Sequence, residues 1–134
     1  MAKIEAIEGI GEVYGAKLRA ANITTTAALL KRCATAKDRK TLAEETGIDA
    51  TYILEWANRA DLFRIKGVGE EYSDLLEAAG VDTVPELAQR NAGNLYKKLL
   101  AVNEEKNLVR RPPTQKAVND WVAQAKELPR ALHY

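Results

Sequence analysis

The groups best suited to chemistry in this 134-residue chain are the backbone amides of a glycine loop that occurs twice. Residues 7–11 read Ile-Glu-Gly-Ile-Gly, and residues 65–69 read Ile-Lys-Gly-Val-Gly. Helix-forming residues follow each loop, and the first amides of a helix have no partner within it. These amides and the helix dipole attract anions, usually phosphate. We call the segments the first and second glycine loops, and their candidate phosphate-binding residues are Gly9, Gly11, Gly67 and Gly69.

The charged residues beside the two loops differ. Arg64 and Lys66 flank the second glycine loop, whereas Ala6 and Glu8 hold the matching places in the first. Nearby cations raise the local concentration of an anionic ligand. The second glycine loop is therefore the stronger candidate for a phosphate site.

Carboxylates follow both loops and favour a different interpretation. Glu12 comes directly after Gly11, and Glu70 and Glu71 come directly after Gly69. A carboxylate in the first turn stabilises a helix by a few tenths to about 1 kcal/mol. It also repels a phosphate from the same place. The alternative is that the glycine loops only pack one helix against another.

A second basic segment lies in the last third of the chain. Residues 107–113, which we call the basic loop, contain Arg110 and Arg111 followed by two prolines. Each proline fixes its own φ and restricts the residue before it, so this segment is partly stiffened. The arginines are candidates to contact a phosphate backbone or an acidic partner. The alternative is an ordinary solvated loop.

The aromatic residues fit packing better than base stacking. Trp56 and Trp121 occupy equivalent positions among apolar neighbours and are expected in the core. Tyr14 and Tyr72 each follow a glycine loop by one turn, where the hydroxyl is expected to bond the backbone of that loop.

Nothing in the sequence indicates catalysis or a cofactor. The single His133 lies beside Tyr134, at a chain end where mobility is common. Ser73 is the only serine and follows no nucleophile motif, and no cluster of Cys and His suits zinc. The single Cys33 lies in an apolar run and reads as a buried small residue. We therefore expect a protein that is not an enzyme and that needs no cofactor or metal.

Composition narrows the class of protein. Lys and Arg number 20 against 19 Asp and Glu, giving a net charge of +1, so any nucleic-acid binding must rest on local charge. No stretch reaches membrane-spanning length, and the start of the chain has no apolar signal region. A single cysteine suits a reducing compartment. We expect a soluble, cytoplasmic protein with no membrane partner.

Periodic apolar residues and capping signals predict only helices. Val13, Leu18 and the alanines around them predict one apolar face on a helix over residues 11–21. Four of the other predicted helices end near Cys33, Glu45, Asp61 and Glu105, and a last one capped by Thr114 ends near Leu128. The helix that ends near Glu105 is expected to begin at Asn94. In the second half a copy of the first helix ends at Gly80, and Thr83 caps the helix that follows, with Pro85 in its first turn. Asn22 and Gly80 suit left-handed positions at helix ends.

The chain is a duplication. The glycine loop returns after 58 residues, and Trp56 is matched by Trp121 at a shift of 65 residues, so the second copy is longer around the basic loop. We predict two related halves, residues 1–62 and 63–134, the second with the extra basic, proline-containing loop near 107–113. The fold class is all-α, with about eight helices in one compact body.

The glycine loops resemble the helix-hairpin-helix motif, which grips the DNA backbone without reading bases in many repair and replication proteins. Residues 53–62 and 65–83 are similar to a bacterial family of uncharacterised proteins built from tandem helix-hairpin-helix units. The resemblance covers nearly the whole chain. It implies a SAM-like fold of the five-helix type, and it implies no particular activity.

Two functions follow from these patterns. The first is a non-catalytic module that binds the nucleic-acid backbone without sequence preference. The residues expected to do so are Gly67, Gly69, Arg64, Lys66, Arg110 and Arg111, with Gly9 and Gly11 in the weaker copy. The second is a protein-interaction or scaffold module whose glycine loops are purely structural. The fold-level analogy favours the first, which is the leading interpretation. The near-zero net charge and the glutamates after both loops favour the second.

Overall fold

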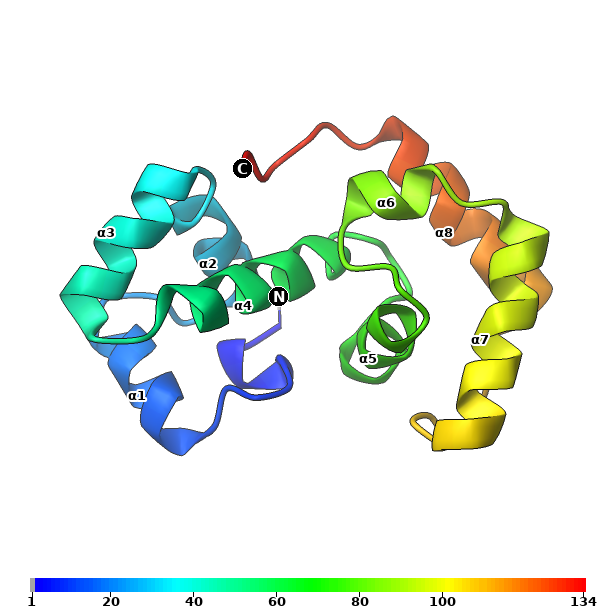
Figure 1. Ribbon diagram of the computed structural model, residues 1–134, viewed down its shortest axis with the longest axis horizontal. Helices are drawn as coiled ribbons and strands as arrows, with labels where there is room; N and C mark the ends of the chain where they lie inside the picture. The colour runs from blue at the N-terminus through cyan, green and yellow to red at the C-terminus, as the bar shows by residue number, and fades with distance from the viewer. Residues whose placement is uncertain (1) are drawn as a thin grey trace. The chain divides into compact units, whose positions relative to one another are not determined.

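The computed structural model describes residues 2–134, and within that range it contains eight α-helices and no strand (Figure 1). The predicted all-α class and the number of helices are confirmed. The helices are α1 (Glu12–Ala20), α2 (Thr26–Arg32), α3 (Ala36–Thr46), α4 (Ala50–Leu62), α5 (Glu70–Ala78), α6 (Val84–Ala88), α7 (Ala92–Lys106) and α8 (Gln115–Glu127). A short 3-10 turn, η1 (Ile4–Ala6), precedes them. The first glycine loop therefore follows a 3-10 turn and not an α-helix.

The helices form two units. The first unit is the chain up to Asp61 together with Arg130–Tyr134, and the second unit is Leu62–Pro129. The two-unit division lies close to the expected boundary, but the end of the chain differs. Residues 130–134 pack with the first unit, whereas the sequence placed them with the second.

The first unit buries apolar residues from η1 and from α1 to α4. Its largest fully buried side chains are Ile4, Ile7, Leu18, Leu29, Leu42 and Ile53. Thr25 and Thr35 cap α2 and α3 by accepting hydrogen bonds from backbone amides. At the end of α3, Gly47 has φ +75°, a left-handed conformation that turns the chain towards α4.

The second unit has a core contributed by α5 to α8, with Leu75, Leu87, Leu99 and Trp121 among its buried members. Helix α8 packs on both α6 and α7, and α5 packs on α7. Thr83 caps α6, which has a proline in its first turn, and Thr114 caps α8, as the sequence predicts. The predicted start of α7 at Asn94 is wrong.

Helix α7 begins two residues earlier because of a cap that the sequence reading missed. Asn91 accepts a hydrogen bond from the amide of Asn94 at 3.0 Å. Asn is as good an N-cap as Asp or Ser. Gly93, the second residue of α7, does not prevent the helix from starting there. The helix therefore covers Ala92–Lys106.

The apolar face predicted for α1 is also wrong in part. Leu18 is buried, but the side chain of Val13 is 69% exposed. The residues of α1 that face the core are Gly15 and Leu18, three positions apart. Val13 lies on the other side of the helix, one turn after the first glycine loop.

The duplication is visible in the backbone of both units. In the first glycine loop the amide of Ile10 donates to the carbonyl of Ile7 at 3.2 Å, and in the second Val68 donates to Ile65 at 3.1 Å. Asn22 and Gly80 both have positive φ, at 66° and 93°, as predicted for helix ends. Helices α4 and α8 both have 13 residues.

Candidate functional site

The first glycine of each loop has a structural role. Gly9 has φ +94° and Gly67 has φ +97°, a region that residues with a Cβ rarely adopt. A Cβ at Gly9 would lie 3.5 Å from Nε1 of Trp56, and one at Gly67 would lie 3.0 Å from Nε1 of Trp121. Each loop therefore lies directly over a buried tryptophan of its own unit.

The tyrosine after each loop packs on the same tryptophan. The ring centroids of Tyr14 and Trp56 are 5.2 Å apart, and those of Tyr72 and Trp121 are also 5.2 Å apart. Tilted aromatic pairs at this distance stabilise beyond their buried area. The predicted core role of both tryptophans is confirmed, and each unit holds its glycine loop on an aromatic base.

The second glycine of each loop has no such structural role. Gly11 and Gly69 have ordinary extended conformations, and a Cβ at either position would meet no atom within 4 Å. Space is therefore open above the first turn of α1 and of α5.

The helices after the glycine loops also differ from the others in their caps. Side chains of Thr or Asn cap α2, α3, α6, α7 and α8, whereas Gly11 and Gly69 offer no side chain to the amides of α1 and α5. Uncapped N-terminal amides bind water or an external acceptor. The two glycine loops thus end in helix termini that are open to a ligand.

A side chain of α8 holds the second glycine loop in place. Gln124 accepts a hydrogen bond from the amide of Lys66 at 2.9 Å and donates to the carbonyl of Lys66 at 3.0 Å. It also donates to Oδ2 of Asp120 at 2.8 Å, one turn earlier on α8. The Lys66 backbone is thereby fixed, while the Lys66 side chain remains exposed.

Arg64 has a structural bond in addition to its charge. Its Nη2 donates to the carbonyl of Pro129 at 2.6 Å, which ties the chain after α8 to the start of the second glycine loop. The residue is half-buried. Part of its hydrogen-bonding capacity therefore serves the fold of the second unit.

The basic loop is an ordered connection between α7 and α8. The side-chain amide of Asn103 donates to the carbonyl of Val109 at 3.2 Å and accepts from its amide at 2.9 Å. Asn107 has φ 52° and ends α7 in the left-handed conformation. Val109 and Pro113 are buried, whereas Arg110 and Arg111 are exposed.

One hydrogen bond joins the basic loop to the helix that follows the second glycine loop. The hydroxyl of Tyr72 in the first turn of α5 donates to the carbonyl of Arg111 at 2.9 Å. The hydroxyl was expected to bond the glycine loop itself, and this expectation is wrong for Tyr72. The bond instead brings the two basic segments predicted from the sequence to one end of α5.

The first glycine loop has a different setting. Glu5 and Arg19 form a two-pronged ion pair at 2.9 and 2.6 Å across the start of the unit, and the hydrogen bonds from Arg19 lower the pKa of Glu5. Glu8 and Glu12 are exposed beside the loop, as is Val13. The structure does not bring Gly9 and Gly11 together with an exposed arginine pair like that of the basic loop.

Two residues that hold the candidate site in place were missed in the sequence. Gln124 and Asn103 are polar residues on helices, and their spacing matches no motif. Their role depends on a contact with a distant segment, which the sequence does not reveal. The one sequence feature that could have indicated this role is that each is an uncharged polar residue on an otherwise apolar or charged helix face.

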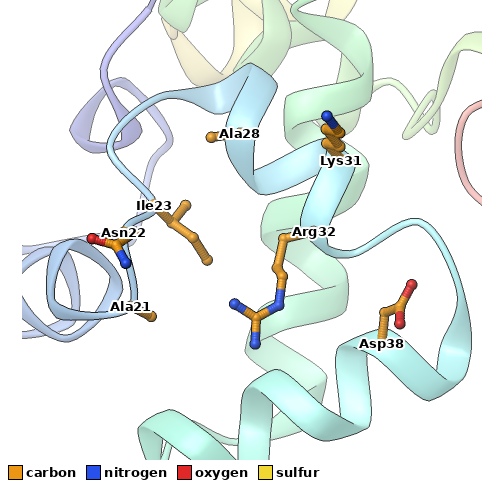
Figure 2. Close-up of a pocket in the computed structure, with 7 residues that line it drawn as sticks. All are labelled: Ala21, Asn22, Ile23, Ala28, Lys31, Arg32 and Asp38. Carbon is orange, nitrogen blue, oxygen red and sulfur yellow. The ribbon is translucent and has the colours of Figure 1, made fainter.

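The first unit also contains an open depression of about 510 Å³ (Figure 2). Arg32 extends from α2 into it and pairs with Glu45 of α3. It contains none of the predicted site residues. Its lining consists of Ala21, Asn22, Ile23, Ala28, Lys31, Arg32 and Asp38.

Residues 2–134 also bear on metal binding and on membrane insertion. In that part of the chain no group of three or more His, Cys, Asp or Glu side chains is arranged to hold a metal ion. None of the helices described for these residues combines the length and the apolar character that crossing a membrane requires.

Fold and site together define an all-helical protein of two units, each with a glycine loop over a buried tryptophan. The family described as "Domain of unknown function (DUF4332)" matches residues 8–128, and the chain belongs to this family. Comparisons with curated proteins and with solved structures found no match.

Proposed function

We propose that this protein is a non-catalytic, cytoplasmic module that binds the DNA backbone without sequence preference. In this proposal both glycine loops act as hairpins of the helix-hairpin-helix type, with the 3-10 turn η1 in place of the first helix in the first copy. The second loop makes the main contact with phosphate. The resemblance of the loops to that motif supports the proposal at the level of the fold. The buried, unpaired Cys33 suits a reducing compartment.

The observation that carries the proposal is the open helix terminus at Gly69. The conformation of Gly69 does not require glycine, and no side chain caps the amides that follow. A missing Cβ lets a phosphate approach these amides closely, where the helix dipole favours negative charge. A glycine with no structural reason is expected where a ligand approaches the backbone.

The exposed charges around this terminus give the ligand a second anchor. Lys66 stands on the second glycine loop, and the bond from Tyr72 to the carbonyl of Arg111 fixes the basic loop at the same end of α5. Arg110 and Arg111 then supply guanidinium groups for neighbouring phosphates. The exposed glutamates Glu70 and Glu71 weaken the grip, so we expect modest affinity.

The proposal is tested by fluorescence anisotropy of a labelled mixed-sequence duplex at low and near-physiological salt. The wild-type protein is expected to bind with a Kd in the range of about 1 to 100 μM at low salt, and binding is expected to fade as salt rises. Lys66→Glu and the double change Arg110→Glu with Arg111→Glu are each expected to weaken binding by about tenfold or more.

The matched control is Lys40→Glu. Lys40 is exposed on α3 of the first unit and gives the same change in net charge as Lys66→Glu. If Lys40→Glu weakens binding as much as Lys66→Glu, the binding reflects overall charge and not the second glycine loop. If the wild-type protein does not bind duplex at low salt, the DNA proposal is wrong.

A second function, protein interaction, is favoured by one observation in the first unit. Val13 is 69% exposed one turn after the first glycine loop, beside the exposed carboxylates of Glu8 and Glu12. An apolar side chain ringed by like charges suits a protein partner better than phosphate. A protein partner captured by the wild type but not by Val13→Ser, with capture unaffected by salt, would support this function.

A further inference from the structure

Residues 130–134 pack on the first unit, and we call the surface that they cover the groove. The segment follows α8 and Pro129 and lies outside the residues matched by the family. It packs on α3, on α4 and on the connection between α2 and α3. The first unit contacts both the backbone and the side chains of this segment.

The groove satisfies the backbone of His133 on both sides. The amide of His133 donates to the carbonyl of Ala34 at 2.8 Å, and Nη2 of Arg39 donates to the carbonyl of His133 at 3.0 Å. Arg39 is only 6% exposed, and its Nη1 donates to the carbonyl of Cys33 at 2.9 Å. The middle residue of the segment is thus held by its main chain, so its side chain need not be specified.

The residues on either side of His133 supply the specificity. Leu132 is 2% exposed, so its side chain is enclosed by the unit. The ring of Tyr134 lies 5.4 Å from the guanidinium carbon of Arg39, within the range of a cation–π contact. Its hydroxyl donates to Oδ1 of Asn58 on α4 at 2.6 Å. The sequence pattern that the groove recognises is therefore Leu, then any residue, then Tyr.

Releasing the segment removes hydrogen bonds and apolar contacts from the groove. The buried guanidinium of Arg39 loses a carbonyl acceptor, the carbonyl of Ala34 loses its donor, and the site of Leu132 loses its apolar filling. Arg39 keeps its hydrogen bond to the carbonyl of Cys33, but its second guanidinium nitrogen loses the acceptor that the segment supplied. An extended peptide that offers the same three features is the occupant that restores them.

We propose that the first unit is a binding module for an extended peptide with Leu and Tyr two residues apart, and that residues 130–134 fill it in cis. Tyr134 is 62% exposed, and Arg130 and His133 are exposed as well, so Leu132 is the one fully buried residue of the segment. A segment at an element end with few buried contacts opens locally far more often than the whole protein unfolds. Another chain carrying the same pattern then enters the vacated groove.

The test uses the full chain and a labelled peptide with the sequence of residues 129–134, Pro-Arg-Ala-Leu-His-Tyr. In the wild type the tethered segment competes at a high effective concentration. The variant Leu132→Asp releases its own segment, because the groove would otherwise enclose a charge. The peptide is expected to bind this variant at least about tenfold more tightly than it binds the wild type.

Two controls identify the groove. A peptide with Ala in place of Tyr is expected to bind Leu132→Asp about tenfold more weakly, and adding Asn58→Ala to the variant is expected to lower the affinity for the original peptide. If Leu132→Asp keeps its helical circular dichroism and yet binds the peptide no better than the wild type, the proposal is wrong.

A milder variant covers the case in which Leu132→Asp unfolds. Tyr134→Ala removes an exposed ring and keeps Leu132, and it is expected to bind the peptide about threefold more tightly than the wild type does. Equal binding by Tyr134→Ala and the wild type would then overturn the proposal. Neither experiment depends on whether the second unit binds DNA.

Discussion

Gly67 and Gly69 are two residues apart, but only Gly67 has a backbone conformation and surroundings that exclude a Cβ. Gly67 has φ +97°, and a Cβ there would lie 3.0 Å from Nε1 of the buried Trp121. We expect Gly67→Ala to lower the free energy of unfolding by about 1 to 3 kcal/mol, because the left-handed backbone and the close indole both oppose a Cβ. Urea denaturation followed by tryptophan fluorescence measures the change.

Gly69→Ser is the matched change at the open position. A serine at the N-cap accepts a hydrogen bond from an amide of α5, so the free energy of unfolding is expected to stay equal or to rise by a few tenths of a kcal/mol. The same side chain occupies the proposed phosphate site, so DNA binding is expected to weaken. A variant that loses stability and keeps its affinity would show that Gly69 serves the fold and not a ligand.

Cys33 makes stability depend on alkaline pH. Burial raises the pKa of its thiol from an ordinary value near 9 to about 12. Between these two values the unfolded chain loses the proton and the folded chain keeps it. This contribution to stability is therefore complete below pH 9 and falls by about 1.4 kcal/mol per pH unit above it.

The measurement compares urea denaturation of the wild type and Cys33→Ala from pH 7 to 10.5. Other groups titrate in both proteins, so the difference between the two curves isolates the thiol. The wild type is expected to lose its stability advantage above pH 9. A difference that stays constant over this range would mean that the thiol ionises in the folded protein as it does in the unfolded one.

Among the helices, α8 has a second task besides packing. Gln124 joins it to the second glycine loop through two hydrogen bonds with the backbone of Lys66. We expect Gln124→Ala to lower the free energy of unfolding by about 1 to 2 kcal/mol and to weaken DNA binding, because the loop is no longer held. Lys126→Ala, on an exposed position of the same helix, is the control and should leave both quantities nearly unchanged.

Helix α7 controls the basic loop in a similar way. Asn103→Ala leaves both backbone groups of the buried Val109 without a partner, at an expected cost of about 1 to 3 kcal/mol. The loosened loop should be cut faster by trypsin between Arg110 and Arg111, since the next bond precedes a proline and resists the enzyme. Asn94→Ala, at the exposed start of α7, should be cut at the wild-type rate.

The sequence predicted the helices well because the caps are local. Thr25, Thr83 and Thr114 begin helices where the pattern of a small polar residue before an apolar stretch indicates them. Asn91 was missed because Asn94 offers the same kind of signal three residues later. Val13 was misplaced because an apolar residue type was taken as a sign of burial, whereas it lies on the side of α1 away from Gly15 and Leu18.

Much less of the candidate site could be predicted. The glycine loops were visible as a repeat, but the sequence does not show that Gly67 serves the fold while Gly69 leaves open space. Nor does it show that Tyr72 brings the basic loop to the end of α5. Such contacts join residues 39 positions apart, and only the packing of α5 on α7 brings them together.

For the molecule as a whole, a net charge of +1 limits how strongly any nucleic acid can bind. Three exposed cations, Lys66, Arg110 and Arg111, are available to the proposed phosphate contact. The logarithm of the binding constant should therefore fall with the logarithm of salt concentration with a slope of about −2.7, at about 0.9 per contact. A slope steeper than about −5 would require contacts from elsewhere in the chain.

The return of residues 130–134 to the first unit sets the order in which the protein can be completed during synthesis. The second unit is one continuous stretch, Leu62–Pro129, so all of it leaves the ribosome before the last piece of the first unit does. The first unit emerges earlier, and the groove beside Arg39 stays unfilled until residues 62–129 have been made. A nascent chain stalled at Pro129 would display that vacant groove to any Leu-x-Tyr peptide, and adding residues 130–134 would close it.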